Sequence, residues 1–147
     1  MLVLVPTRLE AELLLDGPCP ADWRPVDTRI AGRAARAALV GFGPVAAAVL
    51  GALALRETAE EPVWLVGLAG TYRPDWLPVG ALLTATEAIC ADVGRGRGDT
   101  LVGPEALGLE PSWERVGLAR APAPPPDAIP GPLVTVGRAS GSRAEAA

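Results

Sequence analysis

The chain has 147 residues, half of them hydrophobic, which is enough for one domain with a buried core. Its 13 basic residues, all arginine, stand against 17 acidic ones, so the net charge is −4 and a nucleic-acid-binding surface is not expected. Histidine and lysine are absent, which excludes a Ser-His-Asp triad, histidine-bound metals and the lysine of a phosphate-binding loop. Catalysis must therefore rest on carboxylates, hydroxyls, arginines, tyrosine, cysteine or backbone amides.

The apolar start of the chain, residues 2–5, is too short for a signal peptide or a membrane span and has no basic segment before it. No other apolar run approaches the length that crosses a membrane, so we expect a cytoplasmic protein without membrane contact. Cys19 and Cys90 lie far apart and outside any CxxC spacing. They predict two free thiols, with neither a disulfide framework nor a metal site.

The first predicted element is a strand over residues 2–6, which is apolar throughout and therefore expected in the centre of a sheet. Thr7 and Glu10 have the spacing of a capping box, in which Thr7 caps a helix and Glu10 reaches back to the cap amide. That helix is expected to end near Gly17. Residues 24–30 and 37–41 are further strand candidates.

A βαβ pattern follows. A helix is predicted over residues 46–56 with Pro44 in its first turn, and a buried strand over 63–68 comes next. The apolar runs before and after this helix both end in glycine. In open α/β sheets, ligands bind at the carboxyl ends of the strands, so the pattern predicts a ligand pocket there.

The second half of the chain alternates loops with shorter strands. Residues 71–78 predict a loop, residues 81–89 a strand and residues 133–136 a short final strand. The Pro-rich run 121–132 is expected to be an extended surface connection. Ser142 and Glu145 then have the spacing of a capping box, and the sequence ends five residues after Ser142, so we expect the natural domain to continue.

Gly41, Gly43 and Ala46 fit the G-x-G-x-x-A fingerprint of dinucleotide-binding folds. The acid that should follow the next strand and bind the ribose is absent after residues 63–68. A Rossmann-type dehydrogenase therefore remains an alternative function, and the absence of the ribose-binding acid counts against it.

Three further sets of residues have both a functional and a structural interpretation. Glu12, just past the first strand, is either a general base over the sheet edge or a solvated helix residue. Glu87 and Asp92 form an acidic strand end. Tyr72 and Trp76 either cover a purine or pack against the protein.

The order of these motifs resembles the nucleoside phosphorylase/nucleosidase superfamily. Its glycine-rich, Ala-Gly, Val-Gly and acid-ended strand segments correspond here to residues 40–48, 67–70, 77–80 and 87–94. Within the superfamily, residues 84–94, 105–108, 134–136 and 140–142 look most like futalosine hydrolase, the menaquinone-pathway nucleosidase. The match runs over the whole chain but covers only the first part of the family's domain.

The resemblance implies a three-layer α/β fold, one domain over residues 1–147 with a central mixed sheet flanked by helices and its C-terminal part missing. It implies hydrolysis of a purine N-ribosidic bond by a cytoplasmic homodimer without cofactor or metal, with futalosine as substrate and Glu12 activating the water. The residues that it places around the nucleoside are Phe42, Gly43, Leu68, Ala69, Gly70 and Ser140.

Two departures from the family pattern are Thr71, in place of a second glycine, and Ala81, in place of the aspartate after Val-Gly. The sequence also ends before the family's ribose-binding Met-Glu and purine-binding Ser-Asp pairs. Two alternatives to futalosine hydrolysis therefore stay open. One is a methylthioadenosine/S-adenosylhomocysteine nucleosidase, and the other is an inactive nucleoside-binding or dimer-forming remnant.

Overall fold

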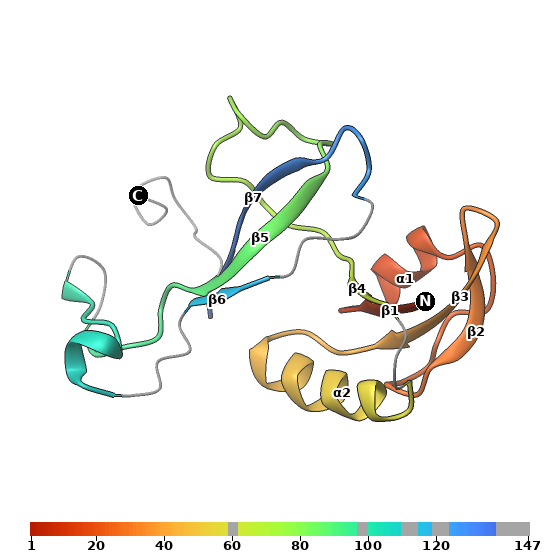
Figure 1. The fold of residues 1–147 in the computed structure, drawn as a ribbon, viewed down its shortest axis with the longest axis horizontal. Coiled ribbons are helices and arrows are strands. Elements are labelled where there is room, and N and C mark those ends of the chain that lie inside the picture. The colour runs from red at the N-terminus through yellow and green to blue at the C-terminus, as the bar shows by residue number, and fades with distance from the viewer. Residues whose placement is uncertain (59–61, 97–99, 110–114, 119–123, 138–147) are drawn as a thin grey trace. The chain divides into compact units, whose positions relative to one another are not determined.

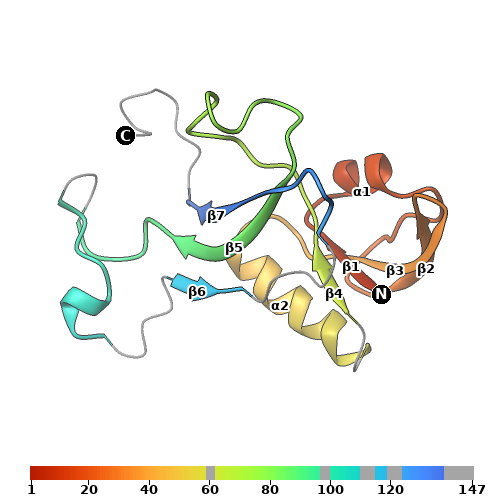
Figure 2. The ribbon, with the colours of Figure 1, turned by 45° about the horizontal axis from the view of Figure 1, so that its top comes forward.

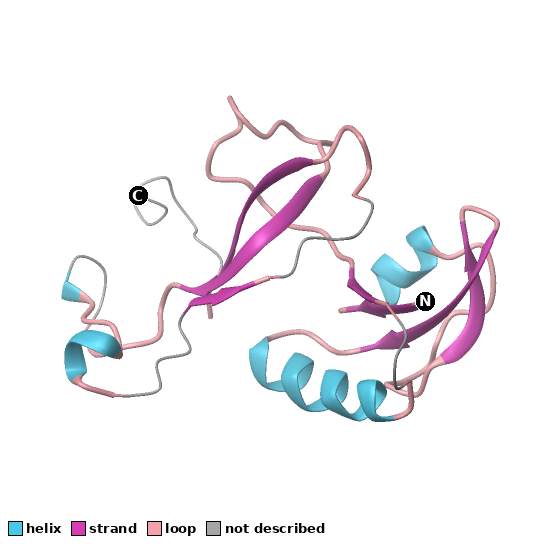
Figure 3. Cartoon of the chain, viewed as in Figure 1, coloured by secondary structure: helices cyan, strands magenta, loops and turns pink. Residues whose placement is uncertain are grey.

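The structure is a computed structural model, which describes residues 1–58, 62–96, 100–109, 115–118 and 124–137. Over these residues the fold is mixed α/β, with two mixed sheets and two α-helices (Figures 1 and 3). The chain divides into two compact units, Met1–Ala69 and Gly70–Ala147. None of the described helices is long and apolar enough to cross a membrane.

The first unit holds a four-stranded sheet with the strand order β2-β3-β1-β4. Its centre is β1 (Leu2–Val5), which runs parallel to β3 (Arg33–Leu39) and β4 (Val63–Leu65), while β2 (Val26–Ile30) is antiparallel to β3. All four residues of β1 are buried, which confirms the central strand that its unbroken apolar run predicts.

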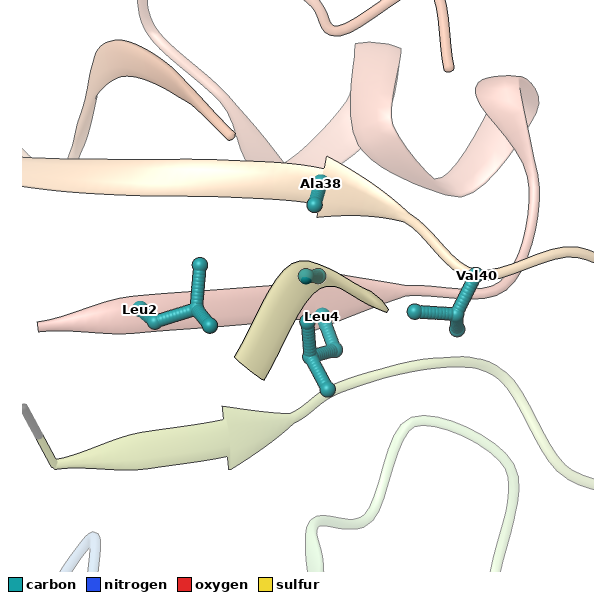
Figure 4. Close-up of a cluster of buried hydrophobic side chains, with 5 residues drawn as sticks. Leu2, Leu4, Ala38 and Val40 are labelled. Carbon is teal, nitrogen blue, oxygen red and sulfur yellow. The ribbon is translucent and has the colours of Figure 1, made fainter. Parts of the chain in front are cut away.

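The two helices of this unit, α1 (Arg8–Leu14) and α2 (Pro44–Arg56), pack on opposite faces of the sheet. Successive side chains of a strand point to opposite faces, so β1 contributes to two separate cores. One core, drawn in Figure 4, consists of Leu2, Leu4, Ala38, Val40 and Ala54 of α2. The other contains Val3, Val5 and Ala11 of α1.

The strand predicted as buried over residues 63–68 is shorter and more exposed in the structure, so this prediction is wrong. Val63 is 43% exposed and Leu65 62% exposed. Among the described residues, β4 pairs with β1 alone and has no strand on its outer side. An apolar sequence run identifies the strand but not its place at the edge of the sheet.

The turn between β2 and β3 has positive φ angles at both central residues, Ala31 (47°) and Gly32 (73°). This geometry favours Asn-Gly, because an alanine side chain crowds the backbone in the left-handed region. We therefore expect Ala31→Asn to raise the free energy of unfolding by about 0.5–1 kcal/mol, measured by urea denaturation. The control, Gly32→Ala, should lower it. Equal stability of the Ala31→Asn and unaltered proteins would contradict a strained Ala31.

The second unit is built on β5 (Leu83–Cys90), the middle strand of a three-stranded sheet. It pairs antiparallel with β6 (Arg115–Gly117) and parallel with β7 (Ile129–Thr135). A bulge interrupts the β5–β7 ladder between Ala85 and Glu87. The short 3₁₀ helix η2 (Glu105–Leu107) lies in the connection from β5 to β6.

The Pro-rich run predicted as a surface connection is partly a strand. Residues 121–123 lie outside the described residues, but Ile129–Thr135 forms β7 and so includes two prolines of the run. The Ile129 N–H donates to the Leu82 carbonyl, 2.9 Å away, which turns the nitrogens of Pro130 and Pro132 away from β5. Proline is tolerated at such an edge because the ladder needs no N–H there.

Trp76, one of the two loop aromatics with open roles, packs against β7. A Cβ atom on Gly131 would lie 2.8 Å from Cη2 of Trp76 and 3.1 Å from Cδ1 of Leu83. Gly131 therefore leaves room for the indole, whose other side is exposed to solvent. This contact favours the packing role of Trp76 over a cover for a purine.

Candidate functional site

The carboxyl ends of three parallel strands meet at one edge of the first unit's sheet (Figure 2). Past the strands, the Val40 N–H donates to the Val5 carbonyl at 2.9 Å. On the other side, the Val66 N–H donates to the Leu4 carbonyl at 3.0 Å. The loops after β3, β1 and β4 therefore begin side by side.

A ligand crevice is expected at this edge from the topology alone. β1 and β3 are neighbours, yet β1 leads into α1 on one face of the sheet and β3 leads into α2 on the other. Where the connections of adjacent strands go to opposite faces, their loops separate and leave the crevice in which α/β proteins bind ligands. By this rule, such a crevice would lie between the start of α1 and residues 41–43.

The Glu10 carboxylate lies at this edge and joins two of the loops. Its Oε1 accepts the Leu68 N–H at 2.8 Å, and its Oε2 accepts the hydroxyl of Thr7 at 2.5 Å. Thr7 caps α1 as predicted, since its Oγ1 accepts the Glu10 N–H at 3.3 Å. The acid of the expected capping box thus bonds to the cap hydroxyl and to the loop after β4.

Gly67 permits this arrangement because it has no side chain. A Cβ atom there would lie 2.9 Å from Oε1 of Glu10 and 3.1 Å from Cγ of Pro6. The resemblance to nucleosidases implies that a ligand closely approaches the backbone of the turn over residues 67–70. In the structure, the group that approaches it is the carboxylate of Glu10.

Glu12, the predicted general base, forms an exposed ion pair instead. Its Oε1 lies 2.8 Å from Nε of Arg8, one helical turn away, and its side chain is 52% exposed. The hydrogen bond to Glu12 raises the pKa of Arg8 above its usual value. The geometry therefore favours Glu10 over Glu12 as the carboxylate of the site. In the sequence, Glu10 is recognisable as the acid of a capping box. That structural role already explains the residue, so the pattern gives no reason to predict it as a functional carboxylate.

Four of the six predicted substrate-binding residues belong to the first unit. Phe42 and Leu68 present apolar side chains to solvent, 89% and 75% exposed, and Ala69 is exposed beside Leu68. Gly43 is the N-cap of α2 with φ 90°, and a Cβ there would meet no atom within 4 Å. Of the other two, Gly70 is the first residue of the second unit, and Ser140 lies outside the described residues.

The second unit repeats the link between two strand ends. Asp92 follows β5, and its Oδ2 accepts the N–H of Gly137, which follows β7. Of the predicted acidic strand end, Asp92 is therefore held by the neighbouring loop, whereas Glu87 lies within β5 opposite Gly117. Because β5 and β7 are parallel, this link is the counterpart of the one between Glu10 and Leu68.

A shallow pocket of about 170 Å³ opens beside the bulge of β5. Thr84 and Thr86 supply its hydroxyl groups, and Leu118, Ala128 and Pro130 contribute apolar surface. No charged side chain is among the described residues that line it. Across the described part of the chain, no three cysteine or carboxylate side chains are grouped so that they would hold a metal ion.

No family model, curated protein or solved structure matches this chain. The resemblance to nucleosidases therefore rests on the sequence motifs, and the geometry at the strand ends is the independent observation to set beside it.

Proposed function

We propose that the protein is a purine nucleosidase of the futalosine hydrolase type, with Glu10 as the general base. The observation that carries this proposal is the Glu10 carboxylate, fixed by Thr7 and Leu68 at the carboxyl edge of three parallel strands. The resemblance supplies the reaction, and the site supplies a carboxylate where α/β proteins bind ligands. The three-layer nucleosidase-like domain is part of this proposal.

In the proposed reaction, water attacks the anomeric carbon of the ribose as the bond to the purine nitrogen breaks. The transition state resembles an oxocarbenium ion, as in glycoside hydrolysis. Glu10 takes a proton from the water, and the purine leaves with a proton from a separate acid or from solvent. Each Glu10 oxygen accepts one hydrogen bond within the protein and keeps acceptor capacity for the water.

The apolar side chains of Phe42 and Leu68 are proposed to pack against the nucleoside. Both are exposed on loops of this edge, where contact with a bound ring would remove their apolar surface from water.

We also propose a homodimer. Its support is the outward face of α2, where Val45, Val49 and Leu55 are exposed, because helices that are apolar all round are normally covered. Light scattering measures the mass in solution.

Release of the free base tests the proposed function. The purified protein is incubated separately with futalosine and with methylthioadenosine, and the products are separated by chromatography. We expect hypoxanthine from futalosine. Adenine from methylthioadenosine alone would assign the protein to the other nucleosidase branch. No base from either substrate, with circular dichroism showing a folded protein, would favour a nucleoside-binding remnant.

A further inference from the structure

We infer that Thr7 is a positioning residue that holds the Glu10 carboxylate in place for catalysis, an inference that rests on the proposed function. A hydroxyl group has one hydrogen to donate and two lone pairs that accept. The Thr7 hydroxyl accepts the backbone N–H of Glu10 and gives its hydrogen to Oε2 of the same residue.

The carboxylate is held from two directions. Thr7, at the end of β1, binds one oxygen, and the Leu68 amide, in the loop after β4, binds the other. A Cβ atom on Gly67 would lie 2.9 Å from Oε1 of Glu10 and 3.1 Å from Cγ of Pro6, so there is no space for a side chain at position 67 beside the carboxylate. A base fixed at both oxygens points in one direction, and a displacement of about 1 Å in such a group can cost about 10²-fold in rate.

The donated hydrogen bond distinguishes this role from helix capping. A cap needs only an acceptor for the backbone N–H, and serine, aspartate and asparagine cap about as well as threonine. Thr7→Asp keeps that acceptor but replaces the hydroxyl donor with a second carboxylate, which repels the Glu10 carboxylate. Thr7→Ser keeps both the acceptor and the donor and is the matched control.

The experiment measures kcat and KM for futalosine hydrolysis together with hydrogen exchange at the Leu68 amide. We expect Thr7→Asp to lower kcat by about 10²-fold with little change in KM, and the Leu68 amide to exchange faster. Helix content by circular dichroism should stay unchanged, and Thr7→Ser should match the unaltered protein. Should Thr7→Asp not fold, Thr7→Gly serves in its place, since glycine is tolerated at an N-cap.

Two results overturn the inference: an unchanged kcat, or unchanged exchange at Leu68, in the folded Thr7→Asp protein. Failure of the proposed function has a different signature, since the unaltered protein would then hydrolyse neither futalosine nor methylthioadenosine. In that case the exchange measurement still decides whether Thr7 holds Glu10, because it needs no substrate.

Discussion

Replacing Glu10 with glutamine is expected to lower kcat for nucleoside hydrolysis by about 10²–10⁴-fold, the range over which a general base contributes. Glutamine has the shape of glutamate but cannot accept the proton of the attacking water. Its amide oxygen still accepts the Leu68 N–H, and its amide nitrogen can donate to the Thr7 hydroxyl, so the fold should persist. Steady-state kinetics measure the loss, and thermal unfolding monitors the fold.

Glu12→Gln is the matched control, because it makes the same chemical change two residues away. Glu12 pairs with Arg8 on the exposed side of α1, and a solvent-exposed ion pair of this kind contributes little to stability. The Glu12→Gln protein should therefore keep nearly all of its activity and stability. Loss of activity in the Glu12 variant, with activity retained in the Glu10 variant, would return the general base to Glu12.

The elements that the sequence predicts well are those with local signals. The unbroken apolar run of β1, the Thr7 cap and Pro44 in the first turn of α2 each depend on a few neighbouring residues, and the structure confirms them. The β4 and β7 predictions depend on distant parts of the chain. Whether a strand lies inside a sheet or at its edge is decided by strands many residues away, which is why β4 proves exposed and β7 includes prolines.

In the candidate site, too, features with local sequence signals are predicted, and features that depend on distant residues are not. The sequence predicts a site at glycine-ended strands, and the structure brings the ends of β3, β1 and β4 to one edge. The sequence does not show that Glu10 is the acid at that edge, because its hydrogen-bond partner, the Leu68 amide, lies 58 residues further along the chain. The capping-box pattern assigned Glu10 to a local partner, and that left Glu12 as the apparent free carboxylate. The loop after β4, a parallel neighbour of β1, supplies the amide that the local pattern omits.

Replacing Gly67 with alanine is expected to displace the Glu10 carboxylate and lower kcat by about 10²-fold. The added Cβ would lie 2.9 Å from Oε1 of Glu10 and about as close to the ring of Pro6, which cannot bend away. The carboxylate is the group that must move, and the Leu68 amide then loses its acceptor. Kinetics measure the rate, and hydrogen exchange at Leu68 reports the lost bond.

Gly117→Ala is the control for this change, because a Cβ at that position meets no atom within 4 Å. Full activity with unchanged Leu68 exchange in the Gly67→Ala protein would show that Glu10 does not depend on this glycine.

Thr7 and Gly67 act on the same carboxylate from two loops. Combining Thr7→Asp with Gly67→Ala should therefore cost less than the product of the two single losses, since groups with a shared partner are not additive. Independent losses would instead place the two residues in separate roles.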